Sequence, residues 1–511
     1  MTLRPASALH GLVAASALLL GACRGSFEPD VTGPVTPPPP PPVTPNLPFR
    51  LGGFGPDFAT GVVTDGLGNA TITGYFQGSV DFNPGAGATV RTAVGGADAM
   101  VAKYRSDGTF AWVFSMGGSG PDLPSDIALT PDGGTVITGV LTPGATCNGK
   151  SVPVLGGRDA FLMKVSSGGA CEWAIAIGGA GDLEDGRDLL VEPNGDILVT
   201  GSFTGTVDFD QGAGTTLLTS RGGNDAFVAR YTSDGSFKAV VQMGGLGDDA
   251  GSALTRTGSG DVIVGGEFTG VATFGSNGSP LLLTSAGESD FFLAQLAPSL
   301  GLVWAVRGGG SGAEYLAHNS LVIEPGGTLV VVGLFSGTAD LDGGPATALL
   351  VSQGATDIFF ARYGVAGQYV GSGRRIGGAG SDGVQGLMVD SDNNFYLAGW
   401  FSGTVDLDPG PGTSFRTSSG TGGAADALLL SLTPGGDLRW ADSFGGVVGG
   451  GASIAITAAI SQTTDGAIWA VGRFFGRADL DPAPEAILAQ ALGDADQFVV
   501  RVERGTGLLR R

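Results

Sequence analysis

The sequence predicts an all-β fold built from one repeated unit, and three observations lead to this prediction. Glycine makes up 94 of the 511 residues and charged residues only 14%, a composition of many turns and buried strands. A Gly-Gly pair recurs at intervals of 61 to 68 residues, starting at Gly52, Gly117, Gly178, Gly244, Gly309, Gly377 and Gly445. These seven units fill residues 49–511 without remainder, which argues against a chain of unrelated domains.

Each unit contains four segments with the alternation of β-strands. In the third unit they are 188–192, 196–203, 226–231 and 236–243, with the turn signals Pro193-Asn194-Gly195 and Ser233-Asp234-Gly235 between the paired segments. Seven units of four antiparallel strands predict a single seven-bladed β-propeller. The last unit stops at Arg511, partway through its fourth strand, and residues 49–53 match the missing half. We therefore expect the ring to close where residues 49–52 pair in the blade that contains 498–502.

The repeat resembles the bacterial β-propeller repeat often abbreviated SBBP. The shared pattern is Gly-Gly-x-Gly, then a strand, a turn with Gly, a strand with Gly-x-Phe, and Gly-x-Asp-Ala-Phe-Val-Ala-Lys. The resemblance covers residues 49–511 and implies the propeller architecture. It implies no reaction, because the repeat defines a fold and not a site.

The first 48 residues are read as an export signal and a tether. Residues 1–22 have the layout of a signal peptide, and Leu20-Gly21-Ala22-Cys23 resembles a lipobox. That resemblance implies cleavage before Cys23, lipidation of Cys23, and anchoring at the bacterial cell envelope, on the outer membrane or cell surface. An ordinary signal peptide with a chance cysteine is the alternative. Residues 23–48, with six prolines from Pro37 to Pro42, form the expected linker.

Residues that recur in the units are interpreted as parts of the fold. An aspartate opens the third strand of each unit, and we expect its carboxylate to accept N–H groups of the preceding turn. Trp112, Trp173, Trp304 and Trp440 share one position on the fourth strand and are expected to pack between blades. The aspartates are Asp98, Asp159, Asp225, Asp290, Asp357, Asp426 and Asp496.

Two further acidic sets are expected on one loop face of the ring, where they make a negative surface. The first follows the Gly-Gly pairs: Asp57, Asp122, Asp182, Asp249, Glu314 and Asp382. The second lies after the second strands: Asp81, Asp208, Asp210, Asp340, Asp342, Asp406, Asp408, Asp479 and Asp481. The second set is a candidate Ca²⁺ site, since Ca²⁺ prefers carboxylate oxygens. Aspartates that cap turns are the favoured alternative.

The composition favours a binding or scaffold module over an enzyme. A net charge of −22 argues against nucleic acid, and His318 is the sole histidine after residue 10, which leaves a histidine-based site poorly supported. The middle residue of Gly-x-Phe varies freely inside the repeat, so Tyr75, Glu267, Trp400 and Arg473 are candidate ligand contacts, unless they pack between blades. Expected partners are a protein or glycan at the cell surface, bound by a monomeric propeller. The alternative is a glycosidase or lyase that uses carboxylates.

Cys147 and Cys171 are predicted to form a disulfide. Both lie in the second unit, at positions that are apolar in other units, such as Phe209 and Phe237 in the third. We infer that the side chains at these two positions touch in every blade, so that in the second unit the contact becomes a covalent bond. An oxidising compartment permits such a bond. Two buried free thiols are the alternative.

Overall fold

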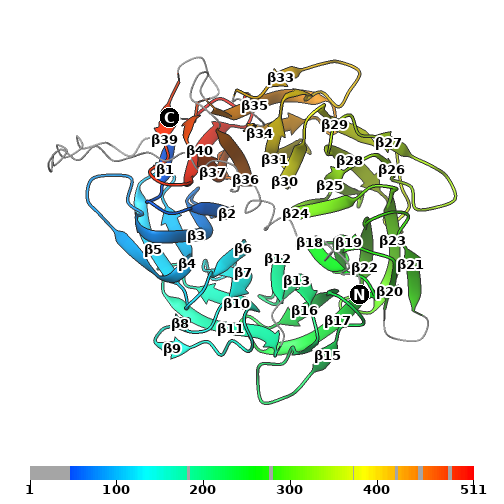
Figure 1. The fold of residues 1–511 in the computed structure, drawn as a ribbon, viewed down its shortest axis with the longest axis horizontal. Coiled ribbons are helices and arrows are strands. Elements are labelled where there is room, and N and C mark those ends of the chain that lie inside the picture. Colours follow the sequence, from blue (N-terminus) through cyan, green and yellow to red (C-terminus); the bar gives the residue numbers. More distant parts are fainter. Residues whose placement is uncertain are drawn as a thin grey trace, which may run out of the picture. The chain divides into compact units, whose positions relative to one another are not determined.

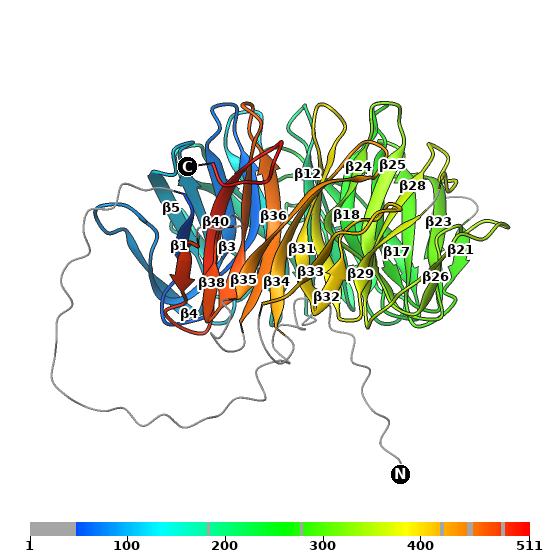
Figure 2. The ribbon, with the colours of Figure 1, turned by 90° about the horizontal axis from the view of Figure 1, so that it is seen from above.

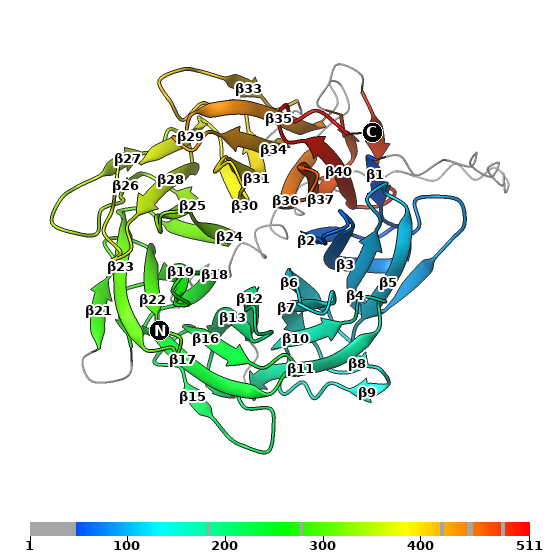
Figure 3. The same cartoon turned by 180° about the vertical axis from the view of Figure 1, so that it is seen from behind.

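The structure is a computed structural model that describes residues 47–180, 184–275, 280–371, 373–419, 424–446, 453–481 and 486–510. Its strands form one two-stranded hairpin, five separate sheets of four or six strands, and one ten-stranded sheet. The larger sheets stand around a common centre (Figures 1 and 3). The strands run from one face of this ring to the other (Figure 2). The fold is an all-β propeller.

The five separate sheets follow one another in chain order. The first contains β2 (Phe58–Thr64), β3 (Ala70–Asp81), β4 (Val90–Tyr104) and β5 (Phe110–Met116). The second contains β6 (Leu123–Leu129), β7 (Thr135–Leu141), β10 (Asp159–Val165), β11 (Cys171–Gly179), β14 (Thr206–Asp208) and β15 (Leu217–Thr219), and the separate hairpin is β8 (Thr146–Cys147) with β9 (Lys150–Ser151). The third contains β12 (Asp185–Val191), β13 (Ile197–Phe203), β16 (Asp225–Tyr231), β17 (Phe237–Gly245), β20 (Val271–Phe274) and β21 (Leu281–Thr284). The fourth contains β18 (Ala250–Arg256), β19 (Val262–Phe268), β22 (Asp290–Leu296), β23 (Leu302–Gly310), β26 (Thr338–Asp340) and β27 (Leu349–Val351). The fifth contains β24 (Glu314–Ile323), β25 (Leu329–Phe335), β28 (Asp357–Tyr363), β29 (Arg374–Gly378), β32 (Thr404–Asp406) and β33 (Phe415–Thr417).

The ten-stranded sheet contains the end of the chain and its first described strand. One antiparallel group is β30 (Asp382–Val389), β31 (Phe395–Ser402), β34 (Ala425–Leu432) and β35 (Leu438–Gly446), extended by β38 (Arg477–Asp479) and β39 (Leu488–Gln490). The other is β36 (Ile454–Gln462), β37 (Ala467–Phe475), β40 (Asp496–Glu503) and β1 (Phe49–Leu51). A single parallel pair, Ala425 with Ile454, connects the two groups. β1 pairs with β40 in the register Phe49 to Val499, so the predicted meeting of the two segments is confirmed.

The four strands predicted for the third unit match β12, β13, β16 and β17 to within a few residues. The sequence interpretation missed the short hairpins that we call the arms, which are β14–β15, β20–β21, β26–β27, β32–β33 and β38–β39. Each arm belongs to one unit and pairs with the outer strand of the preceding unit, as Val207 does with Gly179. The arms lie at the rim of the ring (Figure 1) and cover sheet edges that would otherwise be open.

The Gly-Gly signature is explained by the aspartate that opens each third strand. That carboxylate accepts the N–H of a residue earlier in the preceding turn, for example Asp159 from Leu155 at 2.7 Å, as predicted. A Cβ on the first glycine of each pair would come within 3.0 Å of this carboxylate, as at Gly178 against Asp159. Only glycine therefore leaves room for the buried acid.

The core lies between neighbouring sheets. One cluster joins Leu162 of the second sheet to Phe203 and Phe227 of the third. The residue that ends each Gly-x-Phe frame is fully buried; the seven are Phe76, Leu141, Phe203, Phe268, Phe335, Phe401 and Phe474. Among the described residues no helix is long and apolar enough to cross a membrane.

The predicted disulfide between Cys147 and Cys171 is confirmed. It joins β8 to β11 across a Cα–Cα distance of 5.6 Å, and both side chains are buried. In the third unit, the Cys147 position is taken by Phe209, which packs on Phe203 and Phe227. The second unit thus replaces an apolar contact with a covalent one.

The four tryptophans pack at the seams between units, as predicted. Each indole N–H donates to a carbonyl in the hairpin between the third and fourth strands of the next unit, at 3.0 to 3.2 Å; the pairs are Trp112 to Ser167, Trp173 to Ser233, Trp304 to Val365 and Trp440 to Arg504. A glycine with positive φ lies under each ring: Gly169, Gly235, Gly367 and Gly507. The indoles are therefore structural and are not a platform for sugars.

Candidate functional site

Two of the predicted ligand residues, Tyr75 and Arg473, meet at the ring of Phe58. The ring centroids of Phe58 and Tyr75 are 5.0 Å apart, and the Arg473 guanidinium carbon lies 4.7 Å from the Phe58 centroid. Burial lowers the pKa of Arg473 and, together with Asp57, raises that of Tyr75 to about 12. This group packs β37 against β2, which fits the alternative role of packing between blades.

Trp400 lies apart from that group. Its indole covers Gly383, where a Cβ would come within 3.0 Å of the ring. The four residues predicted from the variable frame therefore do not form one site. The fourth, Glu267, belongs to a polar cluster described below.

The acids that follow the Gly-Gly pairs are buried, so the prediction that they project from a loop face is wrong. Asp57 and Glu314 are 0% exposed. Asp57 accepts the N–H of Gly53 at 2.7 Å and of Gln77 at 3.0 Å, and Asp122, Asp249, Glu314 and Asp382 likewise accept the second glycine's N–H. Their role is to tie the loop to the sheet. Asp182 lies outside the described residues.

Burial gives these carboxyl groups high pKa values. It raises the pKa of Asp57 and Asp249 to about 7, of Asp382 to about 6 and of Glu314 to about 8. The nearby third-strand aspartate raises each further, as Asp290 does for Glu314. These groups titrate near neutral pH within the fold.

The aspartates of the second acidic set cap the arms. Asp208 accepts the N–H of Asp210 at 3.0 Å and of Thr216 at 2.8 Å. The same pattern holds for Asp81, Asp340, Asp406 and Asp479, while Asp210, Asp342 and Asp408 each accept the N–H of a glycine two residues on. Asp481 is buried. Each arm holds its own carboxylates, and in the described part of the chain no three or more His, Cys, Asp or Glu side chains are grouped to hold a metal. The Ca²⁺ hypothesis stays a prediction.

The one large departure from the repeat lies in the inner strand β24. In every other unit the inner strand advances three positions across its bulge while its partner strand advances two, as from Gly251, paired with Gly266, to Leu254, paired with Val264. In β24 the strand advances five positions, from Leu316 to Leu321, while its partner advances two, from Gly333 to Val331. The two additional residues bring His318 and Asn319 to the centre of the ring, and Asn319 has a φ of 51°. Such strain in a non-glycine residue marks a position that the fold alone does not require.

Asn319 reaches across the ring from the fifth sheet to the second. Its Nδ2 donates to Asp126 of β6 at 2.9 Å. Asp126 and Asp188 of β12 both accept the N–H of Leu189, at 3.2 and 2.8 Å. Burial and the neighbouring Asp126 raise the pKa of Asp188 well above its usual range. A side-chain hydrogen bond with Asp126 adds to this rise in the pKa of Asp188.

Arg187 lies at the bulge of β12 and is held by two carboxylates. Its Nε is 3.0 Å from Asp185, its Nη1 pairs with Glu267, and Nη1 also lies 3.4 Å from Ser252. Ser252 donates to the second oxygen of Glu267 at 2.6 Å. Burial by itself would lower the pKa of Arg187, but Asp185 and Glu267 raise it above its ordinary value. Glu267, predicted from the variable frame, is thus placed among partners that the prediction did not name.

We call these residues the central cluster: Asp126, Asp185, Arg187, Asp188, Ser252, Glu267, His318 and Asn319. Burial and the Arg187 charge lower the pKa of His318, so its imidazole is neutral at pH 7. Its Nδ1 is buried and has no hydrogen-bond partner among the described residues, whereas Asn319 is exposed. The cluster offers hydrogen-bond donors and acceptors, and it is acidic, because its four carboxyl groups outnumber the single Arg187 guanidinium.

The sequence contained only a weak signal for this cluster. The step from the Gly-Gly pair to Gly-x-Phe is 24 residues from Gly309 to Gly333, against 22 in four units, but it is 27 from Gly445 to Gly472, so the step alone does not single out the fifth unit. His318 was interpreted as an ordinary polar residue at a strand start. Its position inside the extended bulge is what distinguishes it.

Comparisons with known proteins support the fold and leave the activity open. No protein-family model matches the chain. It is 23% identical to the uncharacterized WD repeat-containing protein L264 of Acanthamoeba polyphaga mimivirus over 438 residues, which are 70% of this chain and 31% of that protein. It is 28% identical to the regulatory protein FlaEY of Caulobacter vibrioides over 217 residues, which are 40% of this chain and 19% of that protein. The chain therefore spans a third or less of these relatives. WD repeats form β-propellers, in keeping with the fold described above.

Solved structures that resemble the chain do so at low sequence identity. An ulvan lyase of polysaccharide lyase family PL25 aligns with 90% of this chain and 98% of its own, at a TM-score of 0.39 and 11% identity. A protein of unknown function from Bacteroides caccae aligns with 67% of this chain and 89% of its own, at a TM-score of 0.32 and 11% identity.

Proposed function

We propose that this chain is a binding protein whose central cluster takes a neutral, hydroxyl-rich ligand, a carbohydrate. The observation that supports this most is the extended bulge of β24, which adds His318 and Asn319 to the centre without serving the repeat. A sugar hydroxyl both donates and accepts, and so matches a cluster in which Arg187 and Asn319 donate and carboxylates accept. The excess of carboxyl groups disfavours an anionic ligand. The ligand site thus moves from the loop face expected from the sequence to the centre.

The test is a carbohydrate array probed with the purified protein. We expect binding to a defined set of neutral glycans by the native chain and loss of it in the double variant His318→Ala with Asn319→Ala. Thr60→Ala changes the equivalent bulge residue of β2 and serves as the matched control, which we expect to bind as the native chain does. Equal binding by all three proteins, or no glycan bound by the native chain, would refute the proposal.

The carbohydrate-active enzyme is a weaker alternative. Glycosidases need two carboxyl groups roughly 5–9.5 Å apart on either side of the bond. Asp126 and Asp188 converge on one N–H, and Asp185 and Glu267 are paired with Arg187. No described pair of acids in the cluster is free for that role, so binding without turnover is favoured.

We also propose that the propeller has seven blades, the ten-stranded sheet counting as two. The group β36, β37, β40 and β1 has the strand order of the other units and touches its neighbour through one parallel pair. Trp440 donates to Arg504 across the boundary as tryptophans do at other seams. An experimental structure tests the count, and six blades would refute it.

The export and anchor are proposed from the sequence resemblance, together with the SBBP-type repeat. Residues 1–46 lie outside the described residues. We expect mass spectrometry of the mature protein from cells to find an acylated Cys23, and the variant Cys23→Ser to leave the membrane fraction. A mature N-terminus elsewhere, or a native chain without lipid, would refute the anchor and place the binding protein free in solution.

A further inference from the structure

Four of the seven seams between units follow one rule, and the other three have Leu47, Ala239 and Ser372 at the position concerned. Counting five residues back from a Gly-Gly pair gives the seam position, which holds Trp112, Trp173, Trp304 and Trp440 in four units. At each of these seams the indole covers a glycine of the next hairpin. Its N–H donates to a backbone carbonyl two or three residues before that glycine. At the closing seam, five residues before Gly52, the position holds Leu47.

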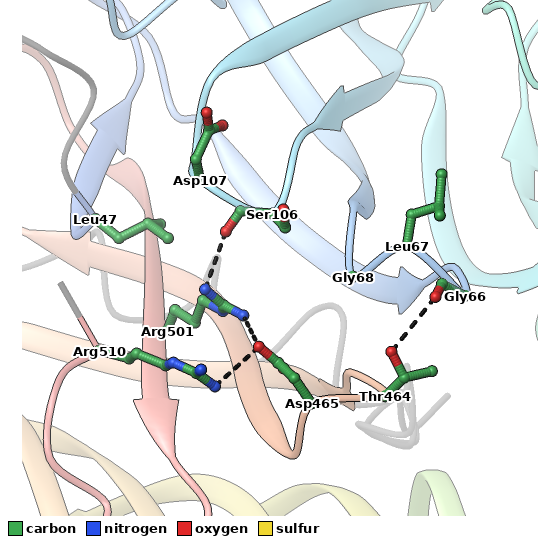
Figure 4. Close-up of a pocket in the computed structure, with 10 residues that line it drawn as sticks. All are labelled: Leu47, Gly66, Leu67, Gly68, Ser106, Asp107, Thr464, Asp465, Arg501 and Arg510. Atoms are coloured by element: carbon green, nitrogen blue, oxygen red, sulfur yellow. Dashed lines mark hydrogen bonds and ion pairs between the residues drawn. The ribbon is translucent and has the colours of Figure 1, made fainter.

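The closing seam contains a pocket where the indole is missing. Its volume is about 490 Å³, and it is lined by Leu47, by hairpins 66–68, 106–107 and 464–465, and by Arg501 and Arg510 (Figure 4). The hairpin glycine is still present as Gly108, with a φ of 83°. Ser106, the counterpart of the carbonyl acceptors at the other seams, accepts from Arg501 Nη1 at 3.0 Å. The hairpin beside the pocket thus keeps the glycine and the carbonyl that an indole contacts elsewhere, and Ser106 and Asp107 of that hairpin line the pocket.

The lining is chemically suited to an aromatic ring. Arg501 and Arg510 are both held by Asp465, at 2.9 and 3.0 Å, so their guanidinium planes are fixed beside the pocket (Figure 4). A guanidinium attracts the face of an aromatic ring. Leu67 at the rim is 81% exposed and offers an apolar contact. The Ser106 carbonyl has a second lone pair for an indole N–H.

We propose that this pocket binds a tryptophan side chain carried by a partner polypeptide. Four other seams of the same molecule serve as the template, because each holds an indole in this place. The pocket lies between the sheet of β2 to β5 and the group of β36, β37, β40 and β1, and it is distinct from the central cluster. The proposal is therefore independent of the carbohydrate ligand.

The experiment measures binding of N-acetyl-tryptophanamide to the full mature chain by ligand-observed NMR titration. Burial of one aromatic ring supports a Kd on the order of 1 mM. Leu47→Trp fills the slot from within, and we expect it to weaken binding at least roughly tenfold, which corresponds to about 1.4 kcal/mol. Leu246→Trp places the same residue at a site that is 86% exposed and outside the pocket, and we expect native affinity there.

A second variant keeps the test decisive if Leu47→Trp does not fold. Leu67→Ala removes an exposed side chain at the rim, and we expect it to weaken binding severalfold without loss of stability. Saturable binding that is weakened by both pocket variants and unchanged in Leu246→Trp supports the proposal. Absence of saturable binding to the native chain, or affinity unchanged in Leu67→Ala, overturns it.

Discussion

Leu300 and Ala239 are predicted to be a compensating pair at the seam between the third and fourth units. Ala239 occupies the position that holds tryptophan at four other seams. Leu300 occupies the hairpin position of Gly169, Gly235 and Gly367; its φ is 63°, and it is 4% exposed. Both residues belong to one hydrophobic cluster. We infer that Leu300 fills the space that an indole fills elsewhere and accepts backbone strain to do so.

The magnitudes follow from burial and strain. Leu300→Gly loses a buried side chain, roughly 3 kcal/mol, and recovers roughly 1 kcal/mol of left-handed strain, a net loss of about 2 kcal/mol. Ala239→Trp alone forces an indole against Leu300, which costs about 2 kcal/mol of overpacking. In the double variant the indole covers the new glycine as at the other seams. We expect its stability to lie within about 1 kcal/mol of native, a coupling of roughly 3 kcal/mol.

Urea unfolding followed by tryptophan fluorescence and circular dichroism measures the three variants against the native chain. The control is Leu246→Gly, an exposed leucine that is expected to change the midpoint little. If the losses of the two single variants add in the double variant, the two residues do not share a slot and the reasoning is wrong.

Three further predictions concern the carboxylates and the disulfide. The folded-state pKa values of Asp57, near 7, and Glu314, near 8, lie above their ordinary values, so the stability from these groups is present at low pH and is lost as pH rises from about 5 to 8. A melting temperature that rises over this window would contradict the assignment. Closing a loop across 24 residues contributes about 3 kcal/mol. The double variant Cys147→Ala with Cys171→Ala should lose that amount, and the denatured, unreduced native chain should react with no thiol reagent. Asp208→Asn keeps the Oδ1 acceptor that caps its arm, so we expect native melting with or without chelator. A Ca²⁺ ligand would instead make the native chain, and not the variant, sensitive to chelator.

The repeated parts of the molecule could be predicted from the sequence because each of them occurs in several units. The Gly-Gly pair, the third-strand aspartate and the Gly-x-Phe frame predicted the strands of each unit, and the pairing of β1 with β40 followed from the incomplete last unit. The disulfide was predicted by the same comparison between units. A residue in a repeat can be compared with its counterparts in the other units, whereas a residue that occurs once offers no such comparison.

The parts that were missed have physical reasons. The arm strands are three or four residues long with exposed leucines such as Leu217, too short for alternation to reveal them. The acids after Gly-Gly were expected in water because charged residues are rarely buried. Here, backbone N–H groups such as that of Gly53 satisfy Asp57. The central cluster depends on contacts between four units, and no local pattern predicts that Asn319 will reach Asp126.

The pairing of β1 with β40 has a consequence for how the chain is made. Residues 49–51 leave the ribosome long before residues 496–503, yet neither segment has its final neighbour until both are present. The outer strands β11, β17, β23, β29 and β35 can each be covered by the arm of the next unit as synthesis proceeds. An emerging chain therefore carries an unclosed ring until residues 496–503 have been synthesised. During that interval the unpaired strand β1 is only three residues long, which limits the edge exposed to aggregation and proteolysis.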